Sequence, residues 1–495
     1  MFNLFKSKVR TRFAPSPTGY VHLGSLRSAL YEYLFAKQNG GTFFLRIEDT
    51  DQSREVSGAV ENLLKVLKWA GIKPDEGVLL DRAGKPSEKG KFGPYTQSKR
   101  LDSYQKYAQE LVNQGYAYYC FCTPERLEKL RREQEELKRP TRYDGQCKKL
   151  TAEEVKERLA KGEKHVIRMR MPENREIKFN DLIRGKVMIN SKELDDQVLL
   201  KADGFPTYHL AHVVDDHLMK STHVIRAEEW LPSTPKHIVL FEYFGWTAPV
   251  YAHLPLILNK DRSKLSKRQG DVAVEDYMKA GYLPEALINY VALLGWNPGT
   301  EQEVFSLDEL IKQFSLAKVH KAGAIFDQQK LDWLNGEYIK KLSNTKFVQL
   351  ARPYLENNVG ALPEGFEIEK ILAIEQERIS KLSEAGEGIK FLFTDTMDYR
   401  PELLIWKKSD KQTALKNLSL VTEELKRLTD WSKENLEKSL LIWIKNSNLT
   451  NGAVLWPLRA ALTGQEKSPT PFEIAEILGK EKTLDRIGQA IKKLS

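Results

Sequence analysis

The first fifty residues alternate between strand-like and helix-like patterns of hydrophobic positions. The pattern of residues 9–14 predicts a short strand, which the loop sequence PSPTG interrupts at residues 15–19. Apolar side chains then recur at helical spacing over residues 25–34, and an apolar run covers residues 42–47. The order strand, loop, helix, strand is typical of the start of a nucleotide-binding α/β sheet.

The same rhythm returns later in the chain, after an interruption. Helical patterns at 60–69 and 101–112 are followed by a region, about 116–203, that mixes a charged helix with short alternating strands. Strand-like and helix-like patterns then alternate again over residues 198–244. We therefore expect an α/β sheet that is split by an insertion.

Beyond residue 270 the pattern becomes helical. Amphipathic helices are predicted at 284–294, 307–314 and 471–478, and no β-rich segment or internal repeat stands out. The last third of the chain is expected to be all-helical.

Length and charge change this picture only modestly. A chain of 495 residues predicts three or more domains, and 77 Lys and Arg against 68 Asp and Glu give a net charge of +9. That excess suits an acidic partner such as nucleic acid without requiring one. With neither an apolar run of about 18 residues nor a signal peptide, we expect a soluble, cytoplasmic protein without membrane contact.

The segment PSPTGYVHLG has the chemistry of a phosphate site. Pro15 and Gly19 fix a loop at the end of the first strand, and the helix that follows offers backbone N–H groups and a positive dipole end. His22 is placed to donate to a phosphate oxygen, and Gly24 lets a flat group such as adenine approach the backbone. Taken alone, the segment fits an ordinary loop with a capping histidine equally well.

A second segment, DRSKLSKR, concentrates cations and hydroxyl groups around Lys264, Leu265, Ser266, Lys267 and Arg268. Such a loop can fold over a triphosphate and stabilise the charge that builds on the leaving pyrophosphate. Its alternative interpretation is a solvated surface loop. The two segments together, in this order around a split α/β fold, indicate an ATP site.

These segments resemble the HIGH and KMSKS signatures of the class I aminoacyl-tRNA synthetases. The sequences FFLRIEDTD, FPTYHLAHVVDDH and VIRAEEW are similar to those of bacterial-type glutamyl-tRNA synthetases, and GPYTQS, AGAIFDQQKLDWLNG and WPLRAALTG extend the resemblance over nearly the whole chain. The resemblance implies a Rossmann-like parallel sheet split by an α+β insertion and followed by an all-α anticodon-binding region. The implied parts are a catalytic first half (1–102), an acceptor-end insertion (103–206), a catalytic second half (207–262), a KMSKS loop with a helical stem-contact domain (263–343) and an anticodon-binding domain (344–495).

The resemblance also implies a glutamate pocket. Arg12, helped by Arg226, would pair with the side-chain carboxylate of the substrate, because a guanidinium grips a carboxylate with two hydrogen bonds. Glu48 would receive the α-amino group. The remaining implied contacts to glutamate are Ala14, Ser16, Tyr208 and His212, and those to ATP are Pro15, Ser16, Gly19, His22, Gly24, Ser25, Glu229, Trp230, Leu265, Ser266, Lys267 and Arg268. The spacing of His209, His212 and His217 suggests a metal site, but the family has no counterpart of it. A structural or pocket-lining role is favoured for His212.

The three cysteines lie in the insertion. Cys120, Cys122 and Cys147, with Tyr143, resemble the zinc site of a subset of these enzymes and of their shorter tRNA-modifying relative. Lys149 stands where some relatives have a histidine ligand, so Tyr143 would complete the shell. Three buried free thiols are the alternative.

The implied reaction joins glutamate to ATP as glutamyl-adenylate and passes the glutamyl group to tRNA-Glu. Its catalytic residues would be His22, Lys264 and Lys267, with Mg²⁺. Charging of tRNA-Gln is left open, and a monomer is expected. Glutaminyl-tRNA synthetase usually reads PEPNG where this chain has PSPTG and carries a β-barrel anticodon region. The shorter glutamyl-queuosine synthetase lacks the helical third. A non-catalytic tRNA-binding paralogue would lose signature residues.

Overall fold

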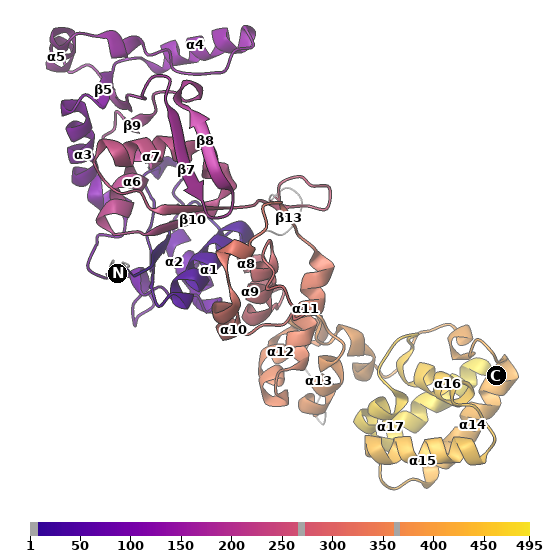
Figure 1. The fold of residues 1–495 in the computed structure, drawn as a ribbon. Helices are drawn as coiled ribbons and strands as arrows, with labels where there is room; N and C mark the ends of the chain where they lie inside the picture. The colour runs from indigo at the N-terminus through magenta and orange to yellow at the C-terminus, as the bar shows by residue number, and fades with distance from the viewer. Residues whose placement is uncertain (1–7, 266–272, 361–366) are drawn as a thin grey trace. The chain divides into compact units, whose positions relative to one another are not determined.

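The structure, a computed structural model, describes residues 8–265, 273–360 and 367–495. The chain divides into two compact units, of which the first comprises Met1–Met278 and Pro284–Gln328 and the second Lys279–Leu283 and Gln329–Ser495. The α/β part belongs to the first unit, and successive helices make up the second (Figure 1).

The N-terminal sheet of the first unit has the predicted start. Strands β1 (Arg10–Phe13), β2 (Thr42–Leu45) and β3 (Glu76–Leu80) are parallel, and β4 (Pro86–Lys89) adds an antiparallel edge. Helix α1 (Leu23–Gln38) connects β1 to β2, and α2 (Ala59–Trp69) precedes β3. Leu26, Leu30 and Leu34 of α1 are fully buried, which explains why the helical apolar spacing predicted this element.

The insertion contains two β structures. Strands β5 (Ala117–Cys120), β6 (Val166–Met169) and β9 (Val198–Leu200) form an antiparallel sheet, accompanied by α3 (Leu101–Asn113), α4 (Pro124–Glu136) and α5 (Ala152–Ala160). The hairpin of β7 (Glu176–Asp181) and β8 (Gly185–Asn190) instead joins the sheet of the second catalytic half, because Asp181 pairs with Tyr251 of β11. The insertion therefore extends a sheet that begins outside it.

The second catalytic half restores the α/β order. Helix α6 (Tyr208–Leu218), β10 (His223–Ala227), α7 (Thr234–Tyr243) and β11 (Val250–Leu254) follow one another, and β10 and β11 are parallel. The two sheets meet where the amide of Thr222 donates to the carbonyl of Arg10 (2.9 Å). The strand β1 that begins the fold thus lies beside β10. This is the position at which a doubly wound sheet opens a ligand-binding crevice.

The remaining elements are mostly helical. The first unit continues with β12 (Ile257–Leu258), α8 (Val274–Lys279), α9 (Pro284–Leu293), α10 (Leu307–Gln313) and β13 (Ala324–Ile325), and β12 pairs with β13. The second unit has α11 (Gln328–Lys340), α12 (Asn344–Val359), α13 (Ile368–Gln376), α14 (Lys411–Arg427), α15 (Lys433–Asn446), α16 (Asn451–Thr463) and α17 (Pro471–Leu494). Within the described part of this unit no strand occurs.

The structure refines two sequence expectations about these helices. The stretch AGAIFDQQKLDWLNG lies in the region expected to be helical, but it contains strand β13 near its start, and its helix begins at Gln328. The helix predicted at 471–478 does end at Leu478, because Gly479 has non-helical angles (φ 71°, ψ 174°) that glycine adopts readily. A second helical segment, which the sequence analysis did not name, follows this kink and completes α17 to Leu494. A membrane-spanning helix would need a long apolar stretch, and none of the helices described has one.

Candidate active site

An open cavity of about 930 Å³ lies at the carboxyl ends of β1 and β10. Loop residues that follow both strands line it, as expected for the crevice of a split parallel sheet. The cavity brings together most of the residues that the sequence nominated, namely Arg12, Ala14, Pro15, Ser16, Gly19, His22, Gly24, Ser25, Glu48, Tyr208, Arg226, Glu229, Trp230, Lys264 and Leu265.

The HIGH-like segment places His22 at the N-cap of α1. The amide of Gly24 donates to His22 Nδ1 (2.9 Å), so the neutral imidazole carries its hydrogen on Nε2. A side chain at Gly24 would lie 3.2 Å from that Nδ1, and Gly19 has a φ of +124°, which few other residues adopt. The local backbone and the His22 ring therefore favour glycine at positions 19 and 24, in addition to the predicted access for adenine at Gly24.

The KMSKS-like segment is described as far as Leu265. Lys264 forms an ion pair with Glu229, which follows β10, and both side chains are about half exposed at the cavity. Ser266, Lys267 and Arg268, which the sequence also nominated, lie outside the described residues.

Arg12, predicted to bind the substrate carboxylate, already has acidic partners. It lies on β1, is 3% exposed, and donates to Asp216 Oδ1 (3.1 Å) and to Glu32 Oε1 (3.1 Å). Burial alone lowers the pKa of Arg12, but the attraction of these two acids outweighs it, and the net pKa is raised. The guanidinium is therefore charged, and its charge is shared with the protein.

A buried ionic network that the sequence did not reveal supports this arginine. Arg46 donates to Asp216 Oδ1 (2.8 Å) and to Glu48 Oε1 (2.9 Å), so that one carboxylate links the two arginines. The neighbouring Asp215 lies 3.8 Å from Arg46 and accepts a hydrogen bond from Arg100 Nε (2.7 Å). Burial raises the pKa of Glu48 against the opposing effect of Arg46. Glu32 of α1 and Asp215 and Asp216 of α6 lie among buried apolar residues of their helices. Acidic residues at such positions are the sign in the sequence from which a buried ionic network could have been predicted.

Arg226 has a different set of partners. It is 6% exposed and donates to Tyr208 Oη (2.8 Å), Thr234 Oγ1 (2.9 Å) and His253 Nε2 (3.1 Å). The carbonyl of Trp230 (3.5 Å) and His237 Nδ1 (3.3 Å) also lie within reach, and all of these partners are uncharged when the imidazoles are neutral. In the described parts of the chain no carboxylate forms an ion pair with Arg226. A buried cation without an anion is costly unless a ligand supplies the charge.

Tyr208 and His212 occupy successive turns of α6. Tyr208 lines the cavity, and burial raises the pKa of its hydroxyl. His212 stacks on the Tyr208 ring (5.3 Å between centroids), is fully buried, and bonds to Asp216 through Nδ1 (2.9 Å). It does not line the cavity, so the structure places it behind the pocket wall, with Asp216 as its partner.

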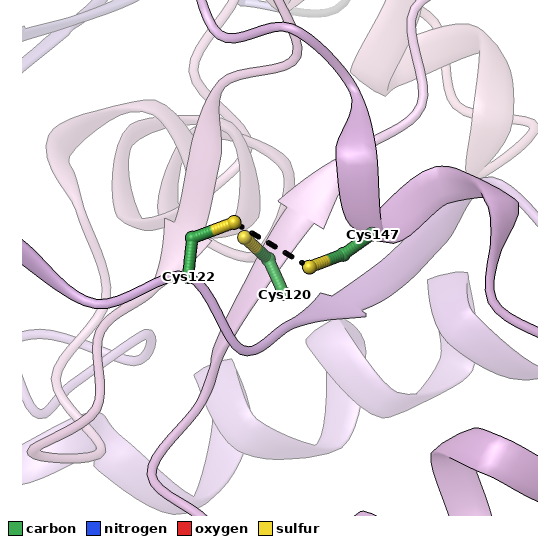
Figure 2. A group of neighbouring side chains, drawn as sticks. All are labelled: Cys120, Cys122 and Cys147. Atoms are coloured by element: carbon green, nitrogen blue, oxygen red, sulfur yellow. Dashed lines mark hydrogen bonds between the residues drawn. The ribbon is translucent and has the colours of Figure 1, made fainter. Parts of the chain in front are cut away.

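The three cysteines converge in the insertion, as Figure 2 shows. Their sulfurs lie within 4.8 Å of one another, and Cys122 Sγ is 3.5 Å from Cys147 Sγ. Tyr143 Oη lies 3.4 Å from Cys120 Sγ and 3.5 Å from Cys122 Sγ. Tetrahedral zinc holds sulfurs about 3.8 Å apart, so this donor set fits the ion. Burial raises the pKa of the Cys122 thiol to about 11, an effect that a bound cation would oppose.

The split parallel sheet, with a HIGH-like loop after its first strand and a KMSKS-like loop after its second half, defines a class I aminoacyl-tRNA synthetase. Residues 8–333 match the family described as tRNA synthetases class I (E and Q), catalytic domain, and residues 346–491 match an anticodon binding domain. The chain belongs to this class I family of tRNA synthetases for E and Q.

Curated relatives and solved structures agree with this assignment. The glutamate–tRNA ligase of Clostridioides difficile is 48% identical, with 97% of this chain and 98% of the relative covered. That of Finegoldia magna is 47% identical, with 98% and 100% covered. A crystal structure of a glutamate tRNA ligase from Elizabethkingia meningosepticum, in complex with its amino acid, superposes with a TM-score of 0.88 at 40% identity and covers 99% of this chain and 100% of that one.

Proposed function

We propose that this protein is a glutamate–tRNA ligase, which activates L-glutamate with ATP and transfers it to the 3′ end of tRNA-Glu. The observation that carries the choice of amino acid is Arg226, a buried guanidinium at the cavity wall whose described partners are uncharged. The side-chain carboxylate of glutamate supplies the missing anion, and the neutral amide of glutamine does not. The relatives described above support the same reaction.

The cavity residues have separate parts in this reaction. Arg226 and Arg12 hold the side-chain carboxylate of glutamate, and Glu48 receives its α-amino group. His22, whose Nε2 carries the hydrogen, donates to a phosphate oxygen of ATP, which binds as its Mg²⁺ complex. The glutamate α-carboxylate attacks the α-phosphorus, and Lys264 and Lys267 stabilise the leaving pyrophosphate. The terminal ribose hydroxyl of tRNA then takes the glutamyl group, and AMP leaves.

Structural zinc forms the second part of this proposal. Cys120, Cys122, Cys147 and Tyr143 would hold the ion, which would tie together two loops of the insertion. Arg126 donates to Cys122 Sγ (3.4 Å), the kind of outer hydrogen bond that fixes a thiolate ligand.

The binding of tRNA is assigned to the domains predicted from the sequence. The insertion (103–206) would hold the acceptor end, residues 263–343 the stem, and the helices of 344–495 the anticodon, with the protein acting as a monomer in the cytoplasm. Splayed anticodon bases are bound by stacking on aromatic rings and by arginines. Both residue types occur at Trp456 and Arg459, whose guanidinium carbon lies 4.9 Å from the Trp456 ring centroid.

Aminoacylation of purified tRNA tests the proposal. Charging of tRNA-Glu with labelled glutamate is the expected result, and incorporation of glutamine in its place would contradict the assignment. Parallel assays with tRNA-Gln decide between a strict enzyme and one that charges both tRNAs with glutamate. A paralogue without activity would bind tRNA and charge neither.

A further inference from the structure

A buried histidine that does not line the cavity contacts Arg226. His253 on β11 is fully buried, and its Nε2 lies 3.1 Å from Arg226 Nε. Its Nδ1 lies 2.6 Å from Asp181 Oδ2, on the neighbouring strand β7. Asp181 and His253 are absent from the cavity lining, so neither contacts the substrate.

The hydrogen bonds of Asp181 fix the state of His253. Asp181 Oδ1 accepts from the amides of Ile183 (2.9 Å) and Arg184 (2.8 Å), which holds the carboxylate in place and favours its charged form. The carboxylate Oδ2 can then only accept, so His253 must carry its hydrogen on Nδ1. Its Nε2 is left with a lone pair, and Arg226 Nε, which can only donate, points at it.

This arrangement orients Arg226 without neutralising it. A carboxylate in direct contact would fix the guanidinium equally well, but it would also supply the anion that the substrate should bring. The neutral imidazole separates Asp181 from Arg226 by the width of a ring. Arg12 shows the contrast within the same cavity, because Asp216 and Glu32 contact it directly.

We propose that His253, held by Asp181, is a positioning residue that sets the preference of the pocket for an anionic over an uncharged side chain. It does so by presenting Arg226 as an oriented cation that no carboxylate among the described residues contacts. The inference rests on the proposed function and deepens it, since it names the residues on which discrimination between glutamate and glutamine depends.

Three substitutions at one position separate orientation from charge. His253→Leu removes the acceptor, and the KM for glutamate should rise by at least about tenfold, because a hydrogen bond to a charged group is lost. His253→Gln can accept from Arg226 through its amide oxygen and should recover much of that loss. His253→Glu places a carboxylate against Arg226 and should raise the KM for glutamate most, while inhibition by glutamine should change least.

The KM values for ATP and tRNA separate positioning from a merely structural role. They should stay within about twofold of the wild-type values, because only the amino acid subsite changes. His223→Gln, on the same strand as Arg226 but bonded to Thr222, is the matched control and should leave all three KM values unchanged. If His253→Leu does not fold, the ratio of the KM values for glutamate of His253→Gln and His253→Glu tests the role of His253.

Failure of the inference is distinct from failure of the proposed function. A wild-type protein that does not charge tRNA with glutamate overturns the function. A wild-type protein that charges normally, with His253→Gln and His253→Glu giving equal KM values for glutamate, overturns the role of His253. A parallel rise of the KM for ATP would show that the substitutions damage the whole site and would also overturn it.

Discussion

Arg12 Nε on β1 and Asp216 Oδ1 on α6 lie 3.1 Å apart and join two segments that are far apart in the chain. The same oxygen accepts from Arg46, which in turn holds Glu48. Arg12, proposed for the side-chain carboxylate of glutamate, and Glu48, proposed for its amino group, are thus linked through Asp216 and Arg46.

Replacing Asp216 with Asn should destabilise the first unit strongly. Two buried guanidiniums would then face each other without their common carboxylate, and removal of one partner from a buried ion pair costs about 3–5 kcal/mol. Urea unfolding followed by circular dichroism measures the change. Glu242→Gln is the control, because its ion pair with Arg175 is exposed and should contribute under about 1 kcal/mol. Equal effects of the two substitutions would contradict the central role of Asp216.

The acid stability of the protein should depend on His212. Burial lowers the pKa of His212 to about 3 from its ordinary 6.5. Between these values the unfolded chain takes up a proton that the folded chain refuses, so the free energy of unfolding falls as the pH falls. One such proton corresponds to about 1.4 kcal/mol per pH unit.

His212→Asn should therefore reduce the loss of stability between pH 6.5 and pH 4. Asn keeps a donor toward Asp216 and does not titrate. Thermal unfolding of both proteins across this range is the measurement, with the exposed His320→Asn as the control. Parallel pH curves for wild type and His212→Asn would show that His212 does not contribute.

The purified protein should contain about one zinc ion per chain, the number that one four-ligand site holds. Elemental analysis after expression with added zinc measures it, and Cys147→Ser should lower the content to background. Lys149→Ala, next to the cluster but not a ligand, should leave it unchanged. The alternative of free cysteines would be favoured by two results together. The native protein would contain no bound metal, and three thiols would react with a thiol reagent in the unfolded, metal-free protein.

Lys267→Ala should reduce pyrophosphate exchange by about 10²-fold or more, because a cation that stabilises the leaving group would be lost. The assay is run with tRNA-Glu present, so that the enzyme carries all of its proposed substrates. Lys260→Ala is the control, a nearby lysine whose ammonium lies 3.8 Å from Asp327. Near-normal exchange by the Lys267 variant would refute the role assigned to it.

The sequence predicted the elements that have a regular hydrophobic pattern. Helix α1 was found because its apolar residues recur at helical spacing, and strand β10 because Val224 and Ile225 form a short apolar run. The pairing of β7 with β11 was not predicted, because a strand pattern does not say which sheet the strand joins. The helix end at Leu478 was predicted, and Gly479 is non-helical as expected of a residue that ends a helix, but the second helical segment of α17 after it was not named.

The residues of the candidate site also divide into those that the sequence predicted and those that it did not. His22, Arg226 and Lys264 were nominated from short motifs, and all three line one cavity. The groups that hold the pocket residues in place were not nominated. Asp216 stands in a helical segment and His253 in a strand, and no local pattern shows which arginine each will contact. Asp216 contacts Arg12 across 204 residues of sequence, and His253 contacts Arg226 across 27. Only the fold brings such partners together.

The split sheet also has a consequence for how the protein is made. Strand β1 is the edge of its own sheet until Thr222 and β10 arrive beside it. During synthesis the ribosome releases β1 long before β10, so the growing chain carries an open strand edge and an unfinished pocket while the whole insertion is translated. Contacts between such distant segments form slowly, and open edges invite aggregation. Nascent chains that stall within the insertion are therefore the form of this protein that depends most on chaperones.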